Sequence, residues 1–284
     1  MRYLIFILAG CWLLTACSDI YDKPLPEYES ELVVEAYVNQ ASPLLNYALV
    51  TKSVDYDNQS LDVLGVAGAK VTLYEGQKDG TELVWDEEGI EYDAVDSVPG
   101  LYFPPITRFF EATEGYYYRL VVEADGIVTT SVTRVPELVP IDSFWADYVF
   151  NENADSVEPY LKFGFRDPQG LGNYYIVSDL EGAELEWPLL WGALDKDIIT
   201  DDLYFDGEPF DVSYVFPRRW GDTINVYLAS IPKEAYDYWV SYENSRGNGG
   251  PFSQPIHVNS TFDNSKGVFH GMAVDTRRMI VQKP

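Results

Sequence analysis

Short runs of alternating apolar and polar residues dominate the chain after residue 30. In residues 71–74, valine and leucine face one way while threonine and tyrosine face the other, which is the period of a β-strand. Asp125-Gly126 separates two such runs, and glycine accepts the positive φ that a tight hairpin turn requires. Strands at short spacing with turns between them are typical of a β-sandwich. We expect strands over residues 32–38, 47–53, 66–74, 100–103, 116–124 and 127–135.

The pattern is interrupted between Pro136 and Pro140, because two prolines in five residues prevent regular strand pairing. We place a domain boundary there, with one domain over residues 31–138 and a second over residues 139–284. Residues 179–211 show neither the two-residue period of a strand nor the 3.6-residue period of a helix, and they are predicted to be rich in loops. Further strands are expected over residues 142–150, 160–165, 173–178, 223–229, 256–258, 267–272 and 279–281.

One segment, residues 230–244, has the spacing of a helix. Ser230 suits the N-cap position, and Pro232 suits the first turn, where its missing N–H does no harm. The predicted fold is therefore mostly β. An immunoglobulin- or transthyretin-like β-sandwich comes first, and a second β-rich domain carrying one helix, at about residues 230–244, follows it.

The N-terminus has the pattern of an export signal with a lipid attachment site. Arg2 precedes an uncharged, mostly apolar run over residues 3–14, which is too short to span a bilayer as a helix. The run ends in Leu14-Thr15-Ala16-Cys17, which resembles the lipobox of bacterial lipoproteins. We expect residues 1–16 to be a signal peptide, Cys17 to carry the membrane-anchoring lipid, and residues 17–30 to form a tether.

Charge and cysteine content narrow the classes of function. The chain has 46 Asp and Glu against 19 Lys and Arg, a net charge of -27, which argues against nucleic acid as a partner. Of its two cysteines, Cys11 lies within the predicted signal peptide and Cys17 is the predicted lipid site. The mature chain then has no thiol for a disulfide, a zinc site or a nucleophile, and we expect no cofactor.

Few residues suggest catalysis. His257 and His270 are the only histidines, each within a strand-like run, and no Gly-x-Ser-x-Gly motif is present. We therefore expect no catalytic residues. Asp201, Asp202 and Asp206 are weak candidates for calcium ligands, because their spacing does not match an EF-hand loop. A solvated acidic turn explains these three residues as well.

Aromatic residues gather in the loop-rich part of the second half. Trp187, Trp191, Tyr204 and Trp220 would form a contact surface for a ligand or partner if they were exposed, and would belong to the core if they were buried.

An ordered series of short motifs resembles a known family. The motifs are Leu32-Val33-Val34-Glu35-Ala36, Gly100-Leu101-Tyr102, Gly115-Tyr116-Tyr117-Tyr118, Pro140-Ile141-Asp142-Ser143, Asp167-Pro168-Gln169-Gly170, Ala235-Tyr236-Asp237-Tyr238-Trp239 and Pro251-Phe252-Ser253-Gln254-Pro255. Together with the lipobox they resemble the Bacteroidota lipoprotein family called domain of unknown function 4249. The resemblance implies an outer-membrane lipoprotein whose relatives often accompany TonB-dependent transporters, and it transfers no catalytic residue.

Two functions follow as expectations. The first is a non-enzymatic binding or accessory lipoprotein of the outer membrane that partners a TonB-dependent transporter, on the cell surface rather than on the periplasmic face. Ser18-Asp19 with Asp22 is similar to an acidic surface-export tag and favours that side. The alternative is a lipid-anchored hydrolase of glycans or peptides that uses Asp201, Asp202 and Asp206.

Overall fold

The computed structural model describes residues 28–54, 64–151, 156–181, 198–214, 219–246 and 256–282. The predicted signal peptide and Cys17 lie outside these ranges. Within them the protein is mostly β, as predicted, and no helix is both long and apolar enough to cross a membrane.

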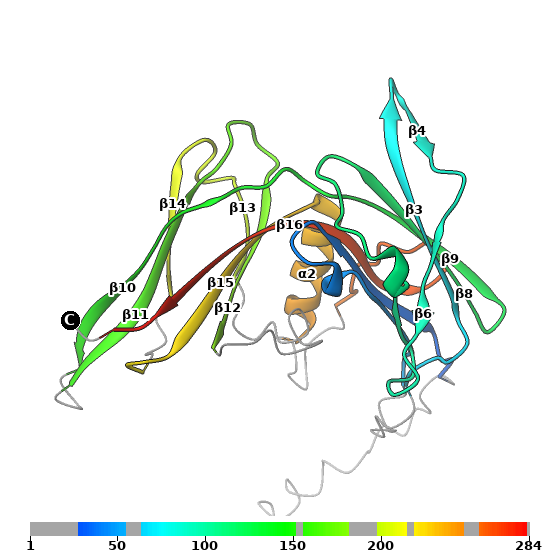
Figure 1. Ribbon diagram of the computed structural model, residues 1–284, viewed down its shortest axis with the longest axis horizontal. Helices are drawn as coiled ribbons and strands as arrows, with labels where there is room; N and C mark the ends of the chain where they lie inside the picture. The colour runs from blue at the N-terminus through cyan, green and yellow to red at the C-terminus, as the bar shows by residue number, and fades with distance from the viewer. Residues whose placement is uncertain are drawn as a thin grey trace, which may run out of the picture.

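An eight-stranded sheet forms the spine of the molecule, in the order β13-β12-β15-β16-β1-β2-β7-β6. Its strands are β1 (Leu32–Asn39), β2 (Ala48–Lys52), β6 (Asp93–Ala94), β7 (Leu101–Phe103), β12 (Tyr174–Glu181), β13 (Ile198–Asp201), β15 (Thr223–Ile231) and β16 (Lys266–Ile280). Figure 1 shows β16 running from one lobe of the molecule into the other.

Two smaller sheets cover one face of this spine. The first lobe adds β3 (Lys70–Asp79), β4 (Glu82–Trp85), β5 (Ile90–Glu91), β8 (Tyr117–Ala124) and β9 (Ile127–Arg134). The second lobe adds β10 (Ile141–Asn151), β11 (Ser156–Arg166) and β14 (Pro209–Tyr214). Alternate residues of the spine strands point into the two sandwich cores, such as Val34 in the first lobe and Val226 in the second. Short 3-10 turns lie at Pro43–Leu45 and Ile106–Arg108.

The helix α2 (Lys233–Arg246) packs on the opposite face of the spine. Ala235 and Trp239 are its buried residues, and they join a core that includes Tyr37 of β1 and Ala229 of β15. The apolar side chains of the helix therefore face the sheet.

The long strand β16 belongs to both lobes. Residues 266–272 pair in parallel with β1, and residues 273–280 pair antiparallel with β15. The end of the chain thus contributes to the sheet of the first lobe as well as to that of the second. The division of the chain at residue 138 stays a prediction.

Most of the expected strands are present, and the differences have local causes. The helix begins at Lys233, because Ser230 is still paired in β15 with Tyr175 and Ala273. The expected strand at residues 256–258 is absent, and the two tail strands are one strand, β16. Within the predicted loop region, β13 and the start of β14 add short strands at sheet edges.

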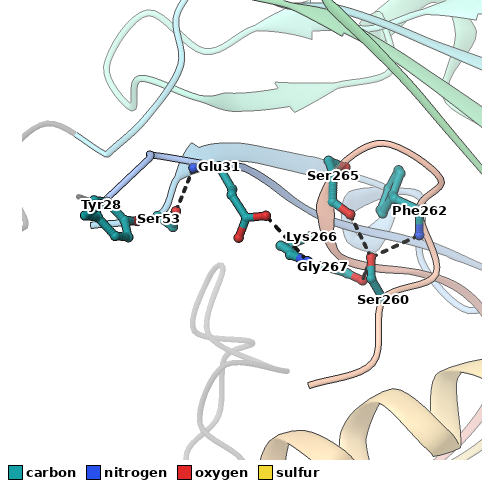
Figure 2. Close-up of polar contacts among 8 residues, drawn as sticks. All are labelled: Tyr28, Glu31, Ser53, Ser260, Phe262, Ser265, Lys266 and Gly267. Atoms are coloured by element: carbon teal, nitrogen blue, oxygen red, sulfur yellow. Dashed lines mark hydrogen bonds and ion pairs between the residues drawn. The ribbon is translucent and has the colours of Figure 1, made fainter. Parts of the chain in front are cut away.

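The described chain enters the first lobe beside the start of β16 (Figure 2). Tyr28 donates a hydrogen bond to Ser53 Oγ, which also accepts the amide of Glu31 at 2.8 Å. The carboxylate of Glu31 lies 3.5 Å from the ammonium of Lys266, the first residue of β16. The chain therefore enters this lobe at the N-terminal end of β1.

Side-chain contacts join the shared strand β16 to the end of β1 in the first lobe and to the start of β10 in the second. The side-chain amide of Gln40, just after β1, exchanges hydrogen bonds of 3.0 and 2.9 Å with the backbone of Val274. Asp275 accepts the amide of Ile141 at 2.7 Å, and Arg277 donates to the carbonyl of Ile141 at 3.2 Å. These bonds hold the start of β10 against the shared strand.

Candidate functional site

A cavity of about 540 Å³ lies where the two lobes meet. Its volume falls within the range typical of small-molecule sites. We call it the interlobe cavity. It is lined by Tyr117, Arg134, Pro136, Glu137, Val139, Pro168, Gln169, Gly170, Gly172, Asn173, Tyr174, Tyr175, Ser230, Ile231, Pro232, Lys233 and Glu234.

One wall of the interlobe cavity is the turn between β11 and β12, residues 167–173, which three carboxylates hold in shape. Asp202 accepts the amides of Gly172, at 3.1 and 2.9 Å, and of Asn173, at 3.0 Å. Asp206 accepts the amide of Gly170 at 2.6 Å. Because two glycines of this turn have positive φ, the backbone amides can converge on the carboxylates.

The third carboxylate is that of Asp167, which is buried and which the sequence did not suggest. It accepts hydrogen bonds from the hydroxyl of Tyr175 and, at 3.0 Å, from the amide of Gly207. Burial and the neighbouring carboxylate of Asp167 raise the pKa of Tyr175 well above its usual value, so its hydroxyl remains a donor. These bonds connect the start of β12, at Tyr175, with the turns that contain Asp167 and Gly207.

Asp167, Asp202 and Asp206 place carboxylate oxygens within 4.8 Å of one another. Asp201, the remaining predicted metal candidate, instead accepts a hydrogen bond from Tyr236 of α2 at 3.3 Å. Carboxylate oxygens are the ligands that calcium prefers. Each carboxylate of the cluster, however, already accepts at least one backbone amide, which gives the cluster a structural role in fixing the turns.

A second part of the lining comes from the end of β15 and the start of α2, beside the start of β12. Ser230 continues the face of β15 that carries Val226 and Leu228, and it is 5% exposed. Lys233 and Glu234 begin the helix immediately after Pro232. The amides of Ala235 and Tyr236 both donate to the carbonyl of Pro232 at 3.1 Å.

The first lobe contributes Arg134, at the end of β9, and Glu137 of the connecting segment; both are exposed. The guanidinium of Arg134 makes one long hydrogen bond, 3.4 Å, to the carbonyl of Gly115. Lys233, the first residue of α2, is paired with Asp237 at 2.5 Å. The interlobe cavity therefore presents charged groups of both signs.

Of the four predicted aromatic contact residues, the structure describes Tyr204 and Trp220, and these two lie apart. Tyr204 is 92% exposed in the turn after β13, whereas Trp220 is partly buried and stacks on Tyr148, with ring centroids 5.6 Å apart. The pairing of β12 with β13 and β15 places these two residues at opposite ends of the second lobe. Trp187 and Trp191 lie outside the described residues.

Neither histidine lines the interlobe cavity. His257 is exposed outside the interlobe cavity, and His270 is buried in the core, where its Nε2 accepts the indole N–H of Trp239 at 3.3 Å. Burial lowers the pKa of His270 to about 3, so the imidazole is neutral.

The comparison with protein families is consistent with this architecture of one continuous two-lobed unit. The family model described as domain of unknown function (DUF4249) matches residues 18–278. The chain belongs to this family. The match includes both lobes, the interlobe cavity and nearly all of β16, so the cavity is made entirely of family-matched residues. No curated protein matches the chain in the comparison made.

Proposed function

We propose that this family member is a lipid-anchored, outer-membrane lipoprotein that binds a ligand without catalysing its conversion. In this proposal it serves as an accessory to a TonB-dependent transporter on the cell surface. The observation that carries the proposal is the interlobe cavity, whose polar lining is supplied by segments from both lobes.

The rigid junction supports a binding role. Gln40, at the end of β1, holds the second-lobe half of β16 through its hydrogen bonds to Val274, and the carboxylates of Asp202 and Asp206 fix the turn that forms one wall. A cavity whose walls are already in place loses little conformational freedom when a ligand enters.

The position of the cavity also suits an anchored protein. The described chain starts just before Leu32, the first residue of β1. The cavity lies near Asn39, the last residue of β1, because the cavity residue Ser230 pairs with Ala273 of β16 and the preceding β16 residue pairs with Asn39. Leu32 and Asn39 are the two ends of β1, roughly 23 Å apart at 3.3 Å per residue. A chain anchored through Cys17 would therefore enter the first lobe at the end of β1 that lies farther from the cavity.

A crosslinked pull-down from outer membranes, read by mass spectrometry, tests the proposal. We expect a TonB-dependent transporter to be enriched with the lipidated chain and not with the Cys17→Ala variant. Recovery of the same proteins with both forms, or of no membrane partner with either, would contradict the accessory role.

A further inference from the structure

The hairpin of β10 and β11 carries apolar residues beyond the core that it helps to form. On β11, the row of side chains that faces the second-lobe core includes Phe165, Phe163 and Leu161, which are all buried. The same row ends in Val157, which is 43% exposed and pairs across the hairpin with Phe150, which is 57% exposed. The core-facing pattern therefore continues to the end of the hairpin, where its side chains are open to solvent.

The other face of this end is apolar as well. Val149 points to the face opposite that of Phe150 and is 52% exposed. Tyr148, also exposed, stacks on Trp220. We call Tyr148, Val149, Phe150 and Val157 the hairpin end. Because large apolar side chains gathered on a surface cost free energy in water, such a patch indicates a contact with an apolar partner.

The charges around the hairpin end do not favour an electrostatic contact. Lys162, on the same hairpin, is paired with Asp147 at 3.1 Å, and Asp147 also accepts a hydrogen bond from Tyr160 at 3.0 Å. The chain as a whole has a net charge of -27, which opposes attraction to an anionic surface. Aromatic and aliphatic side chains without a basic cluster suit the boundary between the headgroups and the acyl chains of a bilayer.

The position of the hairpin end favours a lipid bilayer as the partner. In Figure 1 the paired ends of β10 and β11 reach the lower edge of the molecule on the left, and the blue start of the described chain reaches the lower edge on the right. Tyr28, the first described residue, comes eleven residues after Cys17, and eleven residues span at most about 36–40 Å. A membrane that holds a lipid on Cys17 would thus lie near the side to which the hairpin end points.

We propose that the hairpin end is a second membrane contact, at which Tyr148, Val149, Phe150 and Val157 enter the interface of the bilayer that holds the chain. This inference rests on the lipid anchor of the function proposed above and goes beyond it. An anchor alone would let the protein turn about its tether, whereas two contacts fix its orientation. The turn of residues 167–173, roughly 33 Å away at the other end of β11, then faces away from the membrane with the cavity wall that it forms.

Quenching of a fluorescent label by lipids tests the proposal in the full lipidated chain, held in phosphatidylcholine vesicles. Since the mature chain is expected to have no free thiol, Phe150→Cys gives a single position for an environment-sensitive label. We expect lipids that carry a nitroxide on the acyl chain to quench this label, and the quenching should persist at high salt because the contact is apolar. The same label at Tyr204→Cys, at the opposite end of the second lobe, should be quenched several-fold less.

Matched variants of the labelled protein test whether the apolar side chains make the contact. Val149→Ser should reduce quenching of the Phe150→Cys label several-fold, whereas Leu203→Ser, which removes an equally exposed apolar side chain beside Tyr204, should not. Because both side chains are exposed, neither change should alter the melting temperature by more than a few degrees.

No quenching at either labelled position, equal quenching at both, or no effect of Val149→Ser would overturn the proposal. A change in the label's emission that occurs without lipid and grows with protein concentration would also overturn it, in favour of a second copy of the chain. Mass spectrometry of Cys17 separates this inference from the proposed function. A lipidated Cys17 with an unquenched label refutes the hairpin contact alone, whereas a Cys17 without lipid refutes the anchor and the contact together.

Discussion

The replacement of Asp202 by alanine examines how the turn beside the interlobe cavity is held. The carboxylate of Asp202 is 3% exposed and accepts hydrogen bonds from the amides of Gly172 and Asn173. A hydrogen bond to a charged group contributes about 1.5–3 kcal/mol. Because both donors belong to a partly exposed turn, water replaces part of this loss, and we expect the free energy of unfolding to fall by about 2–3 kcal/mol.

For a chain of this size each kcal/mol lowers the melting temperature by about 2–4 °C, so a fall of about 5–10 °C is expected. Urea unfolding followed by tryptophan fluorescence, together with calorimetry, measures both quantities. Asp206→Ala is the matched control, since Asp206 is exposed and accepts the single amide of Gly170; it should cost no more than about 1 kcal/mol. Equal losses in the two variants, or no loss in Asp202→Ala, would refute a structural role for this carboxylate.

Chelation of divalent cations from the wild-type protein distinguishes a structural role of the three-carboxylate cluster from calcium binding. If the amide contacts alone hold the turns, EDTA should leave the melting temperature of the wild type unchanged. A fall of several degrees with EDTA that calcium reverses would show instead that Asp167, Asp202 and Asp206 hold a cation.

Three further predictions concern the spine of the fold. Gly267→Ala should destabilise the protein by about 3 kcal/mol in urea unfolding, because φ is +115° and the added Cβ would lie 1.9 Å from the carbonyl oxygen of Val34. Gly80→Ala, with open space around the added Cβ, should cost only about 1 kcal/mol. Equal costs in the two variants would contradict the close approach. Burial raises the pKa of Glu35, so its charged form destabilises the fold at neutral pH. Glu35→Gln should therefore raise the melting temperature at pH 7, and the gap between variant and wild type should shrink as the pH falls. A lower melting temperature for the variant at pH 7 would contradict this reasoning. His270 has a pKa of about 3 in the fold against 6.5 when unfolded, so its contribution to stability is complete above pH 6.5 and is lost at about 1.4 kcal/mol per pH unit below it. His270→Gln should flatten this part of the plot of unfolding free energy against pH. An unchanged slope would refute the argument.

Strands with a clear period were predictable because their signal is local. Residues 223–229 alternate in sequence, and in the structure Val226 and Leu228 face the second-lobe core while Tyr227 faces α2. The edge strands β13 and β14 were missed: the first has four residues, and the second begins at Pro209. Short strands at sheet edges have little alternation, and proline is tolerated there.

The candidate site was harder to predict because it is assembled from distant segments. Asp202 and Asp206 are close in sequence, but their partner Asp167 lies more than thirty residues earlier and meets them only through the pairing of β12 with β13. Ser230 was expected to cap α2, and its place in β15 follows from pairing with two neighbouring strands. Arg134 reaches the cavity only because β16 joins the lobes, a contact that no local pattern indicates.

Photocrosslinking from the rim of the interlobe cavity in living cells tests the central claim most directly. A photoreactive residue at Gln169, which is exposed and lines the cavity, would be compared with one at Val84, which is 55% exposed on β4 outside the cavity. The account predicts adducts, identified by mass spectrometry, that form at Gln169 and not at Val84, and that depend on Cys17. Adducts that form equally at both positions, or only at Val84, would contradict a binding function centred on this cavity.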